Sequence, residues 1–370
     1  MNYSTNGSIE ENITYSSTTT EILDQSEDAT SQDPRQEVAD NLWKVCSPIL
    51  ILLGTFGNSV SIAVLCRKSM WKISSSPYLV VLGVADLFVL WTALLRQWLR
   101  FLVNIDIRDF SRVVCKLQIF SLFTFTDFSA WTLVAVTVER FIFVCFPFKA
   151  KSVCTRRRTT FTLVLILLSL ALLNSHFLYG YGSVYEEPAL IPYCGHINDN
   201  YSMFFYQIWP WIDTSVFSLV PFSIIAICNI SIITKIARSR FRNKVAANSA
   251  GEGDNRVKPS SMTALLLSLN TVFLVTTAPV CIFYIGLPEW TRTATSEEKI
   301  ELDLWLAILQ LLMYLNNSVN FLFYCISGPK FRRELRSICG RRGATGTTTN
   351  ESTAPTGVSV IPLREQANSP

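Results

Sequence analysis

Seven long apolar stretches constrain the fold of this chain more than any other feature. They cover residues 45–66, 73–95, 117–138, 159–185, 201–234, 259–288 and 304–329. Each is longer than the roughly 20 residues that an α-helix needs to cross about 30 Å of hydrocarbon. Lipid offers no partner to an unpaired backbone amide, and the alternating pattern of a membrane β-barrel is absent. The sequence therefore predicts an all-α membrane protein, a bundle of seven transmembrane helices.

The composition supports this class and excludes others. Of the 370 residues, 49% are apolar and only 16% are charged, whereas soluble domains carry roughly 25% charged residues. Disordered, collagenous and disulfide-stapled secreted chains do not fit these figures. The sequence holds no P-loop, zinc motif, nucleophile elbow or internal repeat, so neither an enzyme nor a nucleic-acid partner is expected.

The placement of basic residues predicts the orientation. Of the 32 Lys and Arg, 22 fall on the side that includes the C-terminus. Because the side rich in positive charge faces the cytosol, the N-terminus is predicted to be extracellular and the chain to be a multi-pass plasma-membrane protein.

The chain divides into four predicted segments. Residues 1–41 are polar and acidic, which predicts a disordered extracellular tail. The receptor-like membrane domain covers 42–327, a short amphipathic basic helix covers 328–340, and 341–370 form a disordered cytosolic tail. Four sequons outside the spans are candidate glycosylation sites: Asn2, Asn6, Asn12 and Asn200.

The topology also sorts the ten cysteines. Only Cys115 and Cys194 lie clearly in oxidising space, and a bond between them would pin the long outer loop over the mouth of the bundle. Cys339 follows a basic stretch and is a candidate for palmitoylation. No pair has metal-ligand spacing.

Two polar groups inside the spans suggest a mechanism. Asp86 is the only charge in the second span, and Ser129, Asn316 and Asn320 are candidates to surround it. Such a set suits a small hard cation or a water network, with a hydrogen-bonded structural carboxylate as the alternative. Arg140 follows Glu139 at the cytosolic end of the third span, where a restrained guanidinium is a plausible two-state element.

These motifs together resemble a class A, rhodopsin-like G-protein-coupled receptor over nearly all of residues 42–340. The matching marks, in order, are Gly57-Asn58, Leu82 with Ala85-Asp86, the pair Cys115 and Cys194, Glu139-Arg140-Phe141, Pro221, Phe273 with Pro279, and Asn320-Phe-Leu-Phe-Tyr324. The last of these, with Phe321 in place of the usual proline, is similar to the invertebrate FMRFamide and sex-peptide receptor group.

The resemblance implies roles for the matching positions. Asp86, Ser129, Asn316 and Asn320 correspond to a collapsible sodium and water pocket. Glu139, Arg140, Phe141, Asn320 and Tyr324 correspond to the coupling machinery, and Phe273 with Pro279 to the hinge through which span six tilts outward. A Ser/Thr-rich tail such as 345–356 would meet a receptor kinase and an arrestin after phosphorylation.

Several positions depart from the family pattern. Thr277 stands in place of the usual tryptophan of span six, and Asn229 stands where span five often has tyrosine. Residues 258–262, at the base of span six, contain no acid to hold Arg140. We therefore expect a loosely held inactive state with measurable basal signalling.

The ligand class follows partly by exclusion. The opsin lysine position falls at Tyr314, and the amine-binding acid position falls at Leu122, which argues against a light or amine receptor. A long polar outer loop between 179 and 201 suits a β-hairpin rim around an open mouth, as in peptide receptors. The candidate ligand-pocket residues are Arg96, Arg100, Asp127, Asp213, Glu186, Glu187, Tyr284, Gln310 and Tyr314.

The prediction is a receptor for an extracellular ligand, most plausibly a short, amidated neuropeptide, that activates a heterotrimeric G protein. No cofactor is expected apart from sodium at Asp86. The alternatives are a receptor for a lipid or a small acid, which Arg96 and Arg100 would bind, a non-coupling receptor-like protein, and a transporter. A transporter predicts an internal repeat or broken helices, and the sequence lacks both.

Overall fold

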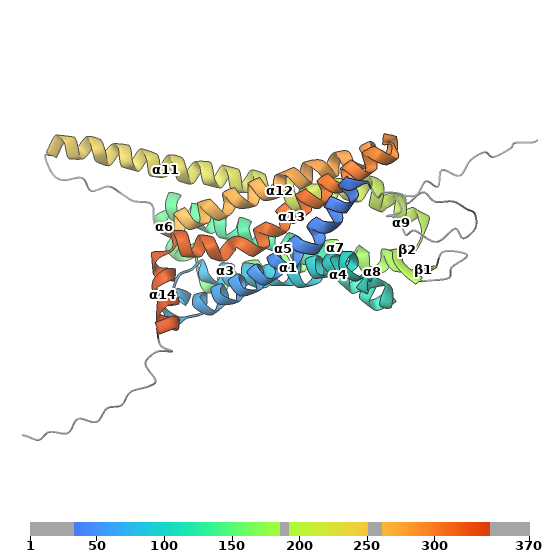
Figure 1. Cartoon of the computed structure of the whole chain (residues 1–370). Helices are drawn as coiled ribbons and strands as arrows, with labels where there is room; N and C mark the ends of the chain where they lie inside the picture. The colour runs from blue at the N-terminus through green and yellow to red at the C-terminus, as the bar shows by residue number, and fades with distance from the viewer. Residues whose placement is uncertain (1–32, 186–191, 251–260, 341–370) are drawn as a thin grey trace, which may run out of the picture.

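The computed structural model describes residues 33–185, 192–250 and 261–340. Within these ranges, seven helical spans are long and apolar enough to cross a membrane, and they lie side by side in one bundle (Figure 1). We number them one to seven: Pro34–Leu65, Ser76–Val103, Arg112–Cys145, Arg156–Gly180, Asp199–Ser239, Thr263–Thr293 and Ser296–Ile326. The predicted all-α membrane fold is confirmed.

Four of the seven spans are single helices, and the other three consist of several elements. Span one is α1 (Pro34–Leu65), span three α5 (Arg112–Cys145), span six α12 (Ser261–Thr293) and span seven α13 (Ser296–Ser327). Span two joins α3 (Ser76–Val89), η1 (Leu90–Leu94) and α4 (Leu95–Val103); span four joins α7 (Arg156–Asn174) and α8 (His176–Gly180). Span five runs through α9 (Asp199–Met203), η3 (Phe204–Ile208), α10 (Trp209–Asp213), η4 (Thr214–Leu219) and α11 (Val220–Ala250). The remaining elements are α2 (Lys68–Trp71), η2 (Ile107–Phe110), α6 (Pro147–Val153), β1 (Tyr181–Tyr185), β2 (Pro192–His196) and α14 (Pro329–Gly340).

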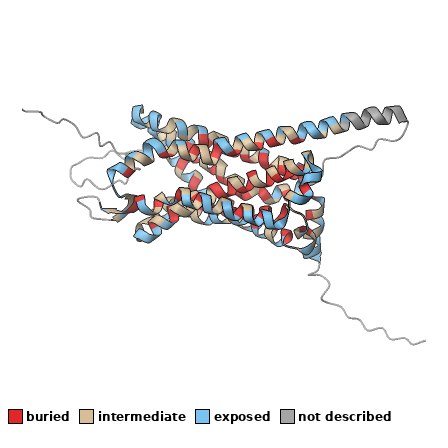
Figure 2. Cartoon of the chain, turned by 180° about the vertical axis from the view of Figure 1, so that it is seen from behind, coloured by how far each residue is buried: buried red, intermediate tan, exposed pale blue. Residues whose placement is uncertain are grey.

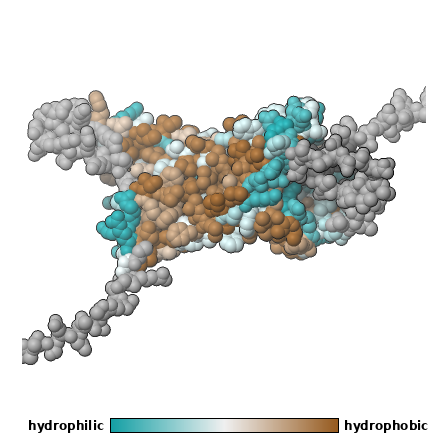
Figure 3. Space-filling model, in the orientation of Figure 1, coloured by the Kyte–Doolittle hydropathy of each residue, from teal (hydrophilic) through white to brown (hydrophobic). Residues whose placement is uncertain are grey.

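Apolar side chains lie both inside and outside the bundle. Buried residues follow the interior faces of the helices (Figure 2), while large residues such as Leu52, Phe161 and Ile227 stay exposed on the outside. In Figure 3 hydrophobic residues cover the middle of the visible face, with hydrophilic residues toward both ends. Soluble proteins do not expose so large an apolar surface to water, so these residues mark the surface that faces lipid.

The helix ends differ from the predicted boundaries in three places. The first helix begins at Pro34 rather than near residue 42, and Asp33 caps it by accepting a hydrogen bond from the backbone N–H of Arg35 at 2.8 Å. Span four ends at Gly180, because the following residues form strand β1. Helix α11 continues to Ala250, well beyond the predicted end of the fifth apolar stretch at residue 234.

The predicted amphipathic helix is present as α14 and packs across the end of the bundle opposite strands β1 and β2 (Figure 1). The ring of Phe331 lies 5.4 Å from that of Tyr324 in span seven. Glu334 forms an ion pair with Arg67 at 3.1 Å, which ties α14 to the end of span one. These contacts fix the helix on the side that the basic residues assign to the cytosol.

Spans two and five contain π-helical turns that the sequence periodicity does not reveal. One follows Asp86 in span two at η1, and two lie in span five at η3 and η4, on either side of α10. Each inserted residue turns the side chains beyond it to a different face of the helix, and such turns are common near functional sites. They decide which side chains of these two spans face the interior.

Candidate functional site

Asp86 is the centre of a hydrogen-bonded cluster in the middle of the bundle. Its side chain is fully buried in α3. Oδ1 accepts hydrogen bonds from Ser129 Oγ and Asn317 Nδ2, both at 2.8 Å, and Oδ2 accepts one from Asn320 Nδ2 at 2.6 Å. Spans two, three and seven are thereby joined through one carboxylate, as burial of a charge in a membrane requires.

The cluster differs from the predicted one in a single member. Asn317, rather than its neighbour Asn316, donates to Asp86, and Asn316 is only half-buried. Asn317 also offers its backbone carbonyl to Asn58 Nδ2 of span one at 2.8 Å. Each of the three side chains around Asp86 also carries an oxygen, so the set suits a sodium ion when the hydroxyl and amide groups turn.

Glu139 and Arg140 are held by two serines at the start of span two. Ser74 Oγ and Ser75 Oγ donate to Glu139 Oε1 at 2.7 and 2.9 Å. The same Ser75 oxygen accepts a hydrogen bond from the Arg140 guanidinium. The arginine is therefore held on the span-two side of the bundle, through a hydroxyl that it shares with Glu139.

A second polar link joins spans three, five and six. Thr137, three residues before Arg140, donates from Oγ1 to Asn270 Oδ1 at 3.0 Å, and Asn270 Nδ2 donates to Asn229 Oδ1 at 2.9 Å. From the sequence, Asn229 was recognised only as a departure from the family pattern, and Asn270 was not identified. A single asparagine in the apolar span six, Asn270, was the available signal, because a buried amide needs a partner.

The predicted hinge residues lie in the interior. Phe273 packs edge-to-face against Phe222 of span five, with ring centroids 5.4 Å apart, and Pro279 lies inside α12. Tyr324 is buried beneath α14, while Phe141 contacts Phe146 at the end of span three with centroids 5.8 Å apart. Phe273 and Tyr324 are therefore packed in the core, and Phe141 lies at the cytosolic end.

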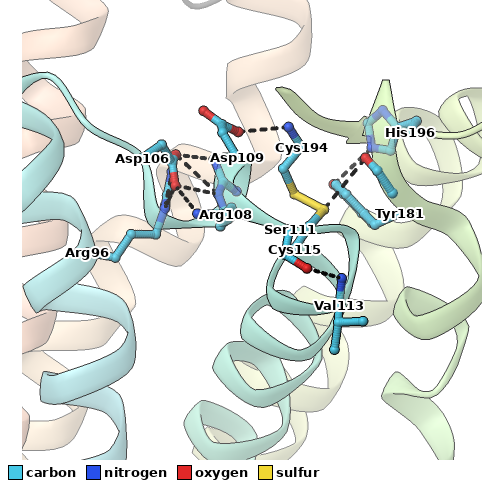
Figure 4. The surroundings of a disulfide bond; sticks show 11 residues. Arg96, Asp106, Arg108, Asp109, Ser111, Val113, Cys115, Tyr181, Cys194 and His196 are labelled. Carbon is cyan, nitrogen blue, oxygen red and sulfur yellow. Dashed lines mark hydrogen bonds and ion pairs between the residues drawn. A yellow bond between two sulfur atoms is a disulfide. The ribbon is translucent and has the colours of Figure 1, made fainter. Parts of the chain in front are cut away.

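At the opposite end a disulfide joins the outer loop to span three (Figure 4). The Cys115–Cys194 bond has an S–S distance of 2.04 Å and confirms the predicted pair. Cys194 lies in β2, which pairs antiparallel with β1 as the predicted hairpin rim. The backbone N–H of Cys194 also donates to Asp109 Oδ1 at 2.8 Å. The hairpin is thus tied to both span three and the first outer loop.

An ion cluster orders that first outer loop. Asp106 accepts hydrogen bonds from both the Arg96 and the Arg108 guanidinium groups, including one from Arg108 at 2.8 Å. Burial acts to raise the pKa of Asp106, but the bonds and charges of Arg96 and Arg108 outweigh it and hold the pKa well below its usual range. Arg96, predicted to face the ligand, is therefore already paired with a carboxylate.

Two further carboxylates lie deeper in the bundle. Asp127 in span three is 2% exposed and accepts a hydrogen bond from Asn174 Nδ2 of span four at 3.0 Å. Asp213, at the end of α10, is close enough for its charge to act on Asp127. Two like charges in a poorly solvated site repel each other, so this pair attracts a cation or a shared proton.

The remaining predicted ligand residues line the outer halves of spans two, six and seven. Gln310 Nε2 donates to the Tyr284 hydroxyl at 2.6 Å, which joins spans seven and six. Arg100 interacts electrostatically with Asp303 of span seven, and Tyr314 is buried. Asn200 lies in α9 and Cys339 in α14. The other predicted loop and tail residues fall outside the described ranges: Glu186, Glu187, Asn2, Asn6 and Asn12.

Comparison with known proteins agrees with this architecture. The chain is 24% identical to the thyrotropin-releasing hormone receptor of Gallus gallus over 82% of this chain and 81% of that receptor. It is 24% identical to neuromedin-U receptor 2 of Rattus norvegicus, covering 80% of this chain and 74% of that receptor. It is 23% identical to cysteinyl leukotriene receptor 1 of Cavia porcellus, covering 83% and 85%.

All three relatives are receptors and none is an enzyme, in agreement with the sequence-based expectation. Residues 57–324, which run from Gly57 within span one to Tyr324, match the 7 transmembrane receptor (rhodopsin family) pattern. Together with the seven spans and the Cys115–Cys194 bond, this match shows that the chain belongs to the rhodopsin family of seven-transmembrane receptors.

Proposed function

We propose that this receptor binds a short extracellular peptide that carries a cationic group, and that it then activates a heterotrimeric G protein at its cytosolic end. The observation that carries the ligand class is the pair Asp127 and Asp213, one buried and one half-buried carboxylate that lack a basic partner among the described residues. Two of the relatives bear the names of peptide receptors. A C-terminal amide suits such a ligand, because it removes a negative charge that would oppose the pair.

Activation follows from the two polar links at the cytosolic end. Outward tilt of span six about Pro279 would break the Thr137–Asn270–Asn229 link and open a cleft beside Arg140. Arg140 would then leave Ser75 for the G-protein α-subunit. A ligand acts by favouring the open state, and it shifts the equilibrium only by its difference in affinity for the two states. Arrestin and a receptor kinase would act later at the C-terminal tail.

The decisive test is a calcium and cAMP assay in cells that express the receptor at the plasma membrane, challenged with short amidated peptides. We expect a response at nanomolar concentration that Arg140→Ala abolishes while ligand binding and surface expression persist. Asp213→Asn should instead weaken binding of a cationic peptide by about tenfold, the loss typical of one charged hydrogen bond. A full response in Arg140→Ala would contradict G-protein coupling through this site.

A small acidic lipid is the second candidate ligand, because one relative bears the name of a leukotriene receptor. The outer arginines argue against it. Arg96 pairs with Asp106, and Arg100 interacts with Asp303, so both positive charges already face carboxylates. Silence with peptides and a response to acidic lipids that Arg100→Ala removes would favour this candidate over the first.

Sodium at Asp86 is part of the same proposal. Asp86, Ser129, Asn317 and Asn320 would hold the ion, with the carboxylate supplying the charge. A bound ion would stabilise the closed bundle, since binding to one state favours that state. We expect sodium chloride, compared with choline chloride, to lower agonist affinity, and Asp86→Asn to remove the difference. An equal sodium effect in Asp86→Asn would contradict this assignment.

A further inference from the structure

A cavity of about 420 Å³ lies on the side of the bundle, far from the outer mouth. It is bordered by residues of span three, the start of span four, the end of α6 with Cys154, and one residue each of spans two and five, Tyr78 and Ile224. Its volume falls in the range of ligand pockets, about 300–1,000 Å³. The wall is mainly apolar and includes Val138, Ile142, Ile166 and Ile224, all of which are only half-buried. The cavity therefore opens toward lipid.

Two charged side chains line this apolar cavity. Glu139 is 5% exposed, and its Oε2 atom has no hydrogen-bond partner among the described residues, although Oε1 accepts two bonds. A buried carboxylate oxygen without a donor is costly, so a donor that enters the cavity would stabilise it. Arg158 lies at the cytosolic rim of span four and is exposed, and no hydrogen bond or ion pair engages it within the described ranges.

We propose that this cavity binds one phosphatidylethanolamine molecule of the inner leaflet. The ammonium group of the lipid donates to Glu139 Oε2, the phosphate pairs with Arg158, and an acyl chain lies against the apolar wall. This headgroup carries one charge of each sign, to match the two charged side chains of the cavity. Phosphatidylcholine has no N–H to donate, phosphatidylglycerol has no positive charge for Glu139, and a sterol has no anion for Arg158.

The position of the headgroup links it to signalling. Glu139 shares the Ser75 hydroxyl with Arg140, so the ammonium group would lie three hydrogen bonds from the coupling arginine. A lipid that neutralises Glu139 would alter the restraint on Arg140 without touching the outer ligand. The proposed site is thus separate from the peptide site but acts on the same two-state element.

The test uses the full-length receptor purified in detergent, with bound lipids counted by native mass spectrometry. Phosphatidylethanolamine, its N,N-dimethyl form, phosphatidylcholine and phosphatidylglycerol are titrated with identical acyl chains. We expect the first lipid to bind about tenfold more tightly than phosphatidylcholine, the ratio that one charge-assisted hydrogen bond provides, with the dimethyl form between them. Equal binding of all four lipids, or tightest binding of phosphatidylglycerol, would overturn the proposal without any variant being needed.

Variants then assign the contacts. Glu139→Gln should abolish the preference for phosphatidylethanolamine over phosphatidylcholine, and Arg158→Ala should weaken both. Arg157→Ala is the matched control, because Arg157 is an exposed neighbour on the same helix that does not line the cavity. Ile166→Trp, which fills the apolar wall, should reduce binding of every lipid to this site. An unchanged lipid preference in Glu139→Gln would place the lipid elsewhere.

Discussion

Individual polar side chains hold the helices of this receptor together. Asp86 joins spans two, three and seven, and Asn270 joins spans three, five and six. In lipid, apolar contact between helices gains little over contact with acyl chains, so interhelical hydrogen bonds contribute much of the specificity. The residues of greatest consequence are therefore the few polar ones that face inward.

Replacing Asn270 should favour the open state. Asn270→Leu removes the bonds to Thr137 and Asn229, each of which contributes about 0.5–1.5 kcal/mol to the closed state. We expect basal G-protein signalling to rise about fivefold or more at equal surface expression. Thr271→Val is the matched control, because the Thr271 hydroxyl bonds only to Leu267 of its own helix. Basal signalling that stays at the level of the unmodified receptor would show that this link does not restrain span six.

At the residue scale, the sequence identified the polar residues inside the spans better than it identified their hydrogen-bond partners. Asp86, Ser129 and Asn320 were correctly brought together, but Asn317 takes the place assigned to Asn316. Adjacent residues point about 100° apart on a helix, and the rotation of span seven is set by packing rather than by its own sequence. The acid pair was proposed as two candidate ligand residues, whereas Asn174 as the partner of Asp127 was not predicted.

Among the elements, the β-hairpin shows how the outer loop is stabilised. The Tyr181 hydroxyl and His196 Nε2 are 2.9 Å apart across the hairpin, beside the Cys115–Cys194 bond. Burial lowers the pKa of His196 from its ordinary 6.5 to about 4. The folded hairpin therefore keeps this ring neutral at pH values where the unfolded chain would take up a proton.

That difference predicts loss of stability in acid. As the pH falls from 6.5 to about 4, the unfolded state gains a proton on His196 and the folded state does not, so stability declines across this window and levels off below it. We expect the melting temperature of the purified receptor to fall over this range, and His196→Gln to show a smaller fall. The melting temperature of each protein at pH 7.5 serves as its own reference, because Gln also loses the ring contacts of His196, so only the change with pH is compared. Identical pH profiles would contradict a role for this ring.

The elements also show where prediction from sequence stops. Seven apolar stretches predicted the spans, because hydropathy reports directly on lipid exposure. The end of span four was missed, because residues 181–185 contain neither a charge nor a proline that would mark the end of a helix, and only pairing with β2 makes them a strand. The π-helical turns of spans two and five were also missed, because one inserted residue leaves the hydropathy of a span unchanged.

At the scale of the whole receptor, the contacts that hold span six closed determine how strongly the receptor signals without a ligand. Within the described ranges, no ion pair joins Arg140 to α12; the Arg140 guanidinium bonds to Ser75, and span six is held by the neutral Asn270 link. Loss of a neutral hydrogen bond costs about 1 kcal/mol, whereas breaking a buried ion pair costs about 3–5 kcal/mol. The free-energy difference that favours the closed state over the open state is accordingly small, and we call it the margin.

A small margin predicts basal activity of the unmodified receptor. When two states differ by a few kcal/mol, the minor state is populated at roughly 0.1–10%, which is enough for a measurable signal from an overexpressed receptor. We expect calcium or cAMP signalling above that of vector-only cells without any added peptide, and Arg140→Ala at matched surface expression should return it to the vector level. A basal signal equal to that of vector-only cells would mean that contacts other than the Asn270 link hold span six closed, and the estimate of a small margin would then be wrong.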